Sequence, residues 1–151
     1  MGKIVTWDEL SESVERLKTQ GKKIVFTNGC FDIIHVGHIR YLKEAKRLGD
    51  ILIVGLNSDS SISYIKPGRP VNRQNDRAEV LASLDMIDYV TVFDESTPYE
   101  LIKLIKPDVL VKGGDWKEEE IIGSDIAKET YSLPYTKGFS TTELIKRIKK
   151  L

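Results

Sequence analysis

The sequence feature that most restricts the fold is a nearly continuous apolar run at residues 50–57, DILIVGLN. A strand with one face in water alternates apolar and polar side chains, whereas a strand covered on both faces is apolar along its length. The segment before it, residues 37–48, has apolar residues at helical spacing, at Ile39, Leu42 and Ala45. A helix followed by such a strand is typical of a parallel sheet that helices cover on both sides.

The same alternation of helical and strand-like segments runs along the whole chain. Further strands are predicted at 22–29, 88–93 and 107–114, and further helices at 7–19, 75–86 (with Asn75 as N-cap), 98–105 and the amphipathic C-terminal segment. This order predicts an α/β protein with a Rossmann-like three-layer α/β/α fold and a mainly parallel sheet of about five strands. A length of 151 residues suits one domain. We therefore expect a single domain over 1–151, with an N-terminal helix at 7–19 and a catalytic core at 22–151.

The charges of the chain balance, because 23 Lys and Arg residues face 23 Asp and Glu residues. A zero net charge argues against a protein that coats nucleic acid or an anionic membrane, although a local basic pocket is compatible with it. The single cysteine, Cys30, cannot form an internal disulfide, which favours a reducing compartment. The chain has neither a signal peptide pattern nor an apolar run of membrane-spanning length. We expect a cytoplasmic, soluble protein.

Polar segments follow the predicted strands at the edge where open parallel sheets bind ligands. They are NGCFDIIHVGH at 28–38, NSDSS at 57–61 and KGGDW at 112–116. The stretch 58–74 has no strong period and contains Gly, Pro and four serines, and long irregular loops of this kind are often functional. We expect it to be a mobile flap that closes over a ligand through Lys66 and Arg69.

The tetrad H-V-G-H at 35–38 is the most informative motif. His35 and His38 are three residues apart and share one side of a helix's first turn, while Gly37 allows a ligand to approach the backbone. A helix N-terminus favours phosphate, and two imidazoles there can donate hydrogen bonds to its oxygens. Two alternatives remain open. The histidines are structural, or they form a metal site with Cys30 and Asp32, although the spacing is not that of a zinc site.

The segment GCFDIIHVGHIRYL resembles the G-x-F-D-x-x-H-x-G-H-x-x-x-L motif of the cytidylyltransferase-like nucleotidyltransferases. Three further blocks, at 57–90, 107–116 and 138–145, are most similar to the adenylyltransferases of bacterial ADP-heptose synthesis. The resemblance covers nearly the whole chain beyond about residue 5. It implies attack by a substrate phosphate oxygen on the α-phosphorus of a nucleoside triphosphate, with release of pyrophosphate. Such a reaction needs positioning and neutralisation of charge more than a general base.

The resemblance and the positions of polar residues give a set of candidate site residues. The expected catalytic residues are His35, His38, Lys66, Ser140 and Thr141. Nucleotide binding is expected of Asn28, Gly29, Cys30, Phe31, Asp32, Gly37, Arg77, Lys112, Gly113, Gly114, Asp115 and Thr142, and binding of the second substrate of Asp59 and Arg69. Simpler roles are also open: solvated charges for Lys66 and Arg69, a surface arginine for Arg77, and a helix N-cap for the hydroxyl residues at 140–142.

The resemblance implies transfer of AMP from ATP to a phosphorylated sugar, D-glycero-β-D-manno-heptose 1-phosphate. Mg²⁺ would be carried by the triphosphate rather than by a metal site of the protein, and the other expected partner is a second copy in a homodimer. Tyr135 stands where glycerol-3-phosphate cytidylyltransferases have an arginine, which favours ATP over CTP. The alternatives are a sister cytidylyl- or adenylyltransferase acting on glycerol 3-phosphate or FMN, and a nucleotide sensor without turnover. No G-x-G-x-x-G follows the first long strand and no G-x-x-x-x-G-K-[ST] is present, which excludes a dinucleotide-dependent dehydrogenase and a P-loop NTPase.

Overall fold

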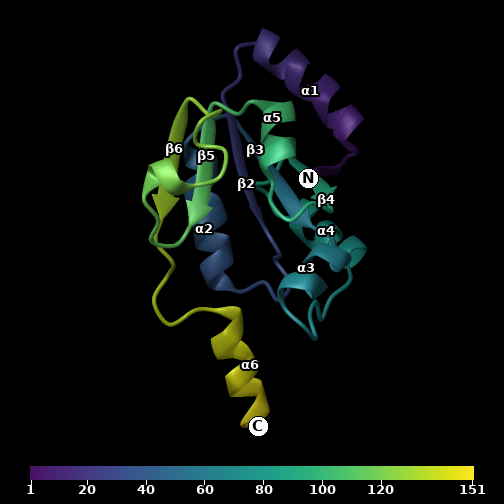
Figure 1. The fold of residues 1–151 in the computed structure, drawn as a ribbon, viewed down its shortest axis with the longest axis vertical. Helices are drawn as coiled ribbons and strands as arrows, with labels where there is room; N and C mark the ends of the chain where they lie inside the picture. Colours follow the sequence, from purple (N-terminus) through teal and green to yellow (C-terminus); the bar gives the residue numbers. More distant parts are fainter.

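Six parallel strands form one sheet in the order β1-β4-β3-β2-β5-β6 in the computed structural model, which describes residues 1–151 (Figure 1). The strands are β1 Lys3–Ile4, β2 Ile24–Gly29, β3 Ile51–Asn57, β4 Tyr89–Phe93, β5 Val109–Gly113 and β6 Glu129–Leu133. The helices are α1 Trp7–Thr19, α2 Val36–Arg47, α3 Asp59–Ile65, α4 Gln74–Ala82, α5 Tyr99–Ile105 and α6 Thr141–Lys149, with a 3₁₀ turn, η1, at Glu118–Glu120. The predicted α/β class and Rossmann-like architecture are confirmed.

The sheet has six strands rather than about five because a two-residue strand, β1, pairs with β4 at one edge. A strand this short carries no periodic pattern by which the sequence could reveal it. The central strands follow the prediction closely: β2 and β3 pair in register from Ile24 with Ile51 to Gly29 with Leu56. Both are almost entirely buried, which the apolar run at 50–57 predicted for β3.

Helices cover both faces of the sheet and make a separate core on each. On one face α2 and α4 bury Leu42, Ala45 and Leu81 against the strands. On the other face α1 and α5 bury Leu10 and Leu101. The last helix, α6, buries no side chain and lies away from the sheet at the C-terminal end of the chain (Figure 1). None of the helices has the length and apolar character needed to span a bilayer.

Two local predictions differ from the structure. Asn75 is not an N-cap, because the N-cap position of α4 lies two residues earlier, at Arg73, whose side chain makes no cap hydrogen bond. The stretch 58–74 is not irregular throughout, because α3 occupies its first half. The Ser58 hydroxyl accepts a hydrogen bond from the Ser61 amide and caps this helix, and Ile62 anchors it in the interior. Only the second half remains available as a flexible flap.

Candidate active site

The candidate site lies where the chain reverses its direction of winding across the sheet. From β2 the chain proceeds to β3 and β4 on one side, and then returns to β5 and β6 on the other. In doubly wound sheets the crevice at the carboxyl ends of the two strands flanking such a point binds ligands. A cavity of about 640 Å³ lies there, between the ends of β2 and β5.

Most of the predicted site residues line this cavity. They are Asn28, Gly29, Cys30, Phe31, Asp32, His35, Gly37, His38, Lys66, Arg69, Lys112, Gly113, Ser140, Thr141 and Thr142. Four predicted residues do not line it: Asp59, Arg77, Gly114 and Asp115. The cavity therefore brings most of the predicted residues together, and the functional roles assigned to them stay predictions.

The loop after β2 needs glycine and a strained residue to bring the histidines into place. Phe31 has a φ of 45°, a left-handed conformation that non-glycine residues rarely adopt and that concentrates at functional sites. Its ring folds back over Gly29, where an added Cβ would lie 2.9 Å from the Phe31 Cε2 atom. A side chain at residue 29 would therefore push the loop out of its position.

The two histidines hold each other and the start of α2 through their Nδ1 atoms. The Nδ1 atom of His35 accepts a hydrogen bond from the Gly37 amide at 3.1 Å, and that of His38 accepts from the His35 amide at 3.2 Å. The ring centroids are 4.0 Å apart. Because an Nδ1 atom that accepts a hydrogen bond carries no hydrogen, the neutral form of each ring has its hydrogen on Nε2. Each ring therefore has one N–H donor available to a ligand.

Both histidines are uncharged at neutral pH. Burial, with a smaller effect of the neighbouring His35, lowers the pKa of His38 to about 4. Burial also lowers the pKa of His35. At pH 7 the pair therefore acts as two neutral hydrogen-bond donors rather than as two cations.

A second helix N-terminus reaches the same cavity from the other end of the chain. The Ser140 hydroxyl caps α6 by accepting from the Glu143 amide at 3.0 Å, and Thr141 lies over the loop after β2 through a long hydrogen bond to the Ile33 carbonyl. A Cβ on Gly37 would lie 2.8 Å from His35 Cε1 and 3.1 Å from Phe139 Cβ, so glycine lets both segments close on this point. The positive ends of α2 and α6 thus meet at one cavity, which favours an anion.

Three cationic side chains complete the wall. Lys66 ends α3 and is exposed, whereas Lys112, in β5, is half-buried, and burial lowers its pKa. Neither of these two lysines forms an ion pair. Arg69 differs, because its Nε atom donates to the Asp32 carboxylate at 2.8 Å. Two unpaired lysine charges therefore remain for a ligand.

Asp32 lies in the cavity wall, but its carboxylate is engaged with the protein. Besides Arg69, it accepts hydrogen bonds from the amides of Val71 and Asn72, each at 2.8 Å. Burial alone would raise the pKa of this carboxyl, but the hydrogen bonds and the Arg69 charge outweigh that effect and lower it. The Asp32 carboxylate therefore holds the loop at 66–72 against the site, and the contact of Asp32 with nucleotide stays a prediction.

Arg77 and Asp59 were predicted to lie in the site, but neither residue lines the cavity. The Arg77 side chain is 1% exposed and donates to the carbonyls of Cys30, Asn57 and Asn72 and to the Asp59 carboxylate, at 2.8–2.9 Å. Its guanidinium ties the loops after β2 and β3 together from inside and does not face the cavity. One signal was present in the sequence, since Arg77 lies four residues before the buried Leu81 and so shares its helix face.

The other differences between the predicted site residues and the cavity lining concern Gly114, Asp115 and several residues that were not predicted. Gly114 is buried behind the cavity with a φ of 120°, and Asp115 is exposed beside it. Tyr135, which the sequence connected with the choice of ATP, also lines the cavity. Residues that sequence reasoning did not connect with the site line it too: Tyr41, Asn57, Ile65, Ser96, Thr97, Pro98, Ile122, Thr136 and Phe139. Most of them carry no motif and reach the cavity through the packing of segments far apart in the chain.

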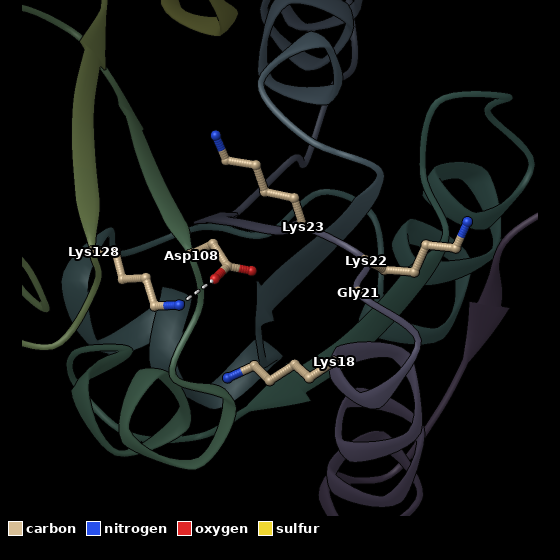
Figure 2. Close-up of a pocket in the computed structure, with 6 residues that line it drawn as sticks. All are labelled: Lys18, Gly21, Lys22, Lys23, Asp108 and Lys128. Atoms are coloured by element: carbon tan, nitrogen blue, oxygen red, sulfur yellow. Dashed lines mark ion pairs between the residues drawn. The ribbon is translucent and has the colours of Figure 1, made fainter.

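A second, smaller cavity of about 300 Å³ lies at the opposite, amino end of the sheet, lined by Lys18, Gly21, Lys22, Lys23, Asp108 and Lys128 (Figure 2). Its charges are largely engaged with the protein. Lys18 donates to the carbonyls of Ile105 and Lys106 at the end of α5, and Lys128 pairs with Asp108 at 3.2 Å. Figure 2 shows Lys22 and Lys23 extending away from Asp108 in different directions. This basic pocket therefore does not have convergent free donors.

Comparison with known proteins agrees with the geometry. The cytidylyltransferase-like family model matches residues 26–147. Bifunctional protein HldE of Aliarcobacter butzleri (strain RM4018) is 56% identical over 148 residues, which cover 97% of this chain and 31% of that protein. HldE of Helicobacter pylori (strain Shi470) is 55% identical over 142 residues, covering 93% and 31%. The chain thus spans about a third of the length of these curated relatives.

Two solved structures share the fold. The crystal structure of a lipopolysaccharide core biosynthesis protein from Thermoplasma volcanium GSS1 has a TM-score of 0.64 and 30% identity, and the match covers 79% of this chain and 100% of that one. Pantoate-β-alanine ligase from Francisella tularensis has the same TM-score at 18% identity and shows the fold alone, with 100% and 79% covered. Since the family model spans most of the residues and the relatives align over nearly all of them, the chain belongs to the cytidylyltransferase-like family of nucleotidyltransferases.

Proposed function

We propose that the chain transfers AMP from ATP to D-glycero-β-D-manno-heptose 1-phosphate, giving ADP-heptose and pyrophosphate. The observation that carries the proposal is the convergence of two helix N-termini, two neutral histidines and two unpaired lysines on one cavity. Fixed donors of this kind bind phosphate oxygens and stabilise negative charge that develops on them. Mg²⁺ arrives bound to the triphosphate, as part of the substrate.

In the proposed reaction a phosphate oxygen of the sugar attacks the α-phosphorus of ATP. The new P–O bond forms as the bond from the α-phosphorus to the pyrophosphate oxygen breaks, and pyrophosphate leaves with that electron pair. No base has to remove a proton, because a sugar phosphate with a second pKa of about 6 is largely ionised at pH 7. The Nε2–H groups of His35 and His38 donate to the phosphate oxygens, and Lys66 and Lys112 balance their charge.

The choice of base and acceptor has separate support. The blocks at 57–90, 107–116 and 138–145 are most similar to adenylyltransferases of ADP-heptose synthesis, and the relatives named HldE align with nearly the whole chain. The similarity to the lipopolysaccharide core biosynthesis protein of Thermoplasma volcanium is consistent with a sugar phosphate acceptor. We also propose a homodimer from the same resemblance, which light scattering coupled to size-exclusion chromatography would measure.

A pyrophosphate-release assay tests the proposal. Each of the four nucleoside triphosphates, with Mg²⁺, is combined with heptose 1-phosphate, glucose 1-phosphate, glycerol 3-phosphate and FMN. We expect the fastest release from ATP with heptose 1-phosphate. Faster release from CTP with glycerol 3-phosphate would overturn the proposed base and acceptor while leaving the family unchanged. Nucleotide binding without release from any pair would instead indicate a sensor.

A further inference from the structure

The end of β5 presents bare backbone to the cavity, with three aromatic rings around it. A Cβ added to Gly113 would lie 3.0 Å from the Tyr135 ring and 3.3 Å from the Tyr41 ring. A Cβ added to Gly114 would lie 2.8 Å from the Trp116 indole and 3.3 Å from Tyr135. Two consecutive glycines are therefore required for the rings to come this close, because side chains there would collide with them.

The three rings are held to different degrees. The Tyr41 ring is fixed inside, since its hydroxyl lies 2.6 Å from that of Thr27. The Trp116 indole N–H donates to the Gly113 carbonyl at 3.2 Å, and the Lys112 ammonium lies 4.9 Å from the centre of its ring. Tyr135 contacts both glycines with its ring, yet is 72% exposed. One side of its ring therefore rests on the glycine backbone while much of the remainder faces the cavity and solvent.

The position of Tyr135 separates it from the phosphate-binding part of the cavity. The histidines and the start of α2 follow β2, and the start of α6 lies against the same loop through the hydrogen bond from Thr141 to Ile33. Tyr135 instead lies over the end of β5, on the other side of the winding reversal. A nucleoside triphosphate whose phosphates contact the histidines extends its base away from them, and the end of β5 borders the same cavity. Aromatic side chains that stack on bases add affinity with little dependence on hydrogen bonding.

We propose that Tyr135 is a stacking platform for the nucleobase and a determinant of preference for purine over pyrimidine. Its inner side is supported by Gly113 and Gly114, so the ring is already oriented before the nucleotide binds. A purine overlaps the ring over a larger area than a pyrimidine and gains more from it. This inference rests on the proposed function, because it assumes that the cavity binds a nucleoside triphosphate.

The experiment compares Tyr135→Ser with Tyr135→Phe, using calorimetric binding of ATP, CTP and inorganic tripolyphosphate in the presence of Mg²⁺. Tyr64→Ser is the matched control, because Tyr64 is 88% exposed and does not line the cavity. Loss of one stacked base is expected to raise the Kd for ATP about tenfold in Tyr135→Ser. The Kd for CTP rises less, and that for tripolyphosphate is unchanged. Tyr135→Phe and Tyr64→Ser bind all three as the wild type does.

A second variant tests the support of the ring independently. Gly113→Ala places a methyl group 3.0 Å from the Tyr135 ring, which must then shift by a few tenths of an ångström. The ATP Kd therefore rises by less than in Tyr135→Ser, and the double variant shows no rise beyond that of Tyr135→Ser. Equal weakening of ATP, CTP and tripolyphosphate would mean that Tyr135 only supports the structure and would overturn the inference. An unchanged ATP Kd in Tyr135→Ser would overturn it too. Failure of the wild type to bind any nucleoside triphosphate would instead overturn the proposed function.

Discussion

The two ends of the sheet both contain a cavity and both carry lysines, yet only one end is suited to bind an anion. At the carboxyl end, between β2 and β5, Lys66 and Lys112 have no ion pairs and two helices begin. At the amino end, Lys18 and Lys128 lie around Asp108, close to where α1 and α5 end. The number of lysines does not separate the two ends. The two ends differ in the direction of the helices that meet them.

In an all-parallel sheet the connecting helices begin at the carboxyl end and finish at the amino end, so their positive ends gather at the former. A lysine at the amino end neutralises the negative end of a helix, as Lys18 does for the last carbonyls of α5. A lysine at the carboxyl end adds to charge that is already positive. The charge of such a lysine therefore stays available to attract an anionic ligand.

The largest expected effect on catalysis comes from the two histidines at the carboxyl end of the sheet. Asparagine can accept the backbone hydrogen bond that Nδ1 accepts, but has no donor where Nε2 lies, so His35→Asn and His38→Asn keep the helix start and lose the ligand donor. We expect each to lower kcat about 10²–10³-fold in the pyrophosphate-release assay. Lys128→Met, at the amino end, serves as the control and retains the wild-type rate. A normal kcat in His38→Asn would make that histidine structural.

Stability gives the second contrast, between the buried Arg77 near the carboxyl-end cavity and the exposed Lys18 at the amino-end cavity. Arg77→Leu leaves the carbonyls of Cys30, Asn57 and Asn72 without their donor, and is expected to cost about 2–4 kcal/mol of unfolding free energy. Lys18→Met, which removes hydrogen bonds near the surface, is expected to cost about 1 kcal/mol. Urea unfolding of both variants measures the difference. Equal losses would contradict the structural role assigned to Arg77.

At the carboxyl end, residues 66–72 are expected to become more ordered when the substrates bind. Hydrogen exchange with a non-hydrolysable triphosphate and the acceptor should protect residues 66–72, while α3 changes less because Ile62 already anchors it. Lys66→Ala should lower kcat/KM about tenfold, since one charged contact to phosphate is lost. If protection is equal in both states and Lys66→Ala has unaltered kinetics, the segment is only a connector.

The smallest expected effect is a dependence of stability on pH. The pKa of His38 is about 4 when folded and close to 6.5 when unfolded, so the unfolded state binds more protons between these values. Stability from this group is complete above pH 6.5 and is lost as the pH falls toward 4, by at most about 1 kcal/mol per pH unit after screening. Urea unfolding of His38→Asn should show a shallower fall across this window. An equally steep fall would assign the acid sensitivity to other groups.

Much of the fold was predictable because it follows from patterns within short segments of the sequence. The run at 51–56 and the helical spacing at 37–48 give a covered parallel sheet, and the carboxyl ends of its strands then locate the site. The H-V-G-H tetrad could be assigned to a helix start because the histidines and Gly37 act within one turn. Local patterns of this kind need no knowledge of distant segments.

The parts that were missed depend on contacts between distant segments. Arg77 was assigned to nucleotide, but it donates to the Cys30 carbonyl 47 residues away, and its place on the helix face of Leu81 does not identify this distant partner. Lys18 meets Ile105 87 residues away. Asp32 likewise holds a loop 40 residues further on at Asn72, which a motif match cannot distinguish from a ligand contact. The same types of charged residue serve in side chains that support a site from within the protein and in side chains that contact a ligand.

The most direct test of the central claim follows the α-phosphorus of ATP. The chain is incubated with Mg²⁺, heptose 1-phosphate and ATP carrying a radioactive label at that phosphorus, and the products are separated by ion-exchange chromatography. We expect the label to appear in a sugar nucleotide and the released pyrophosphate to be unlabelled. His35→Asn and His38→Asn should abolish most of this transfer, whereas Lys128→Met should not. Label found only in ADP or AMP, with no sugar nucleotide formed, would contradict it.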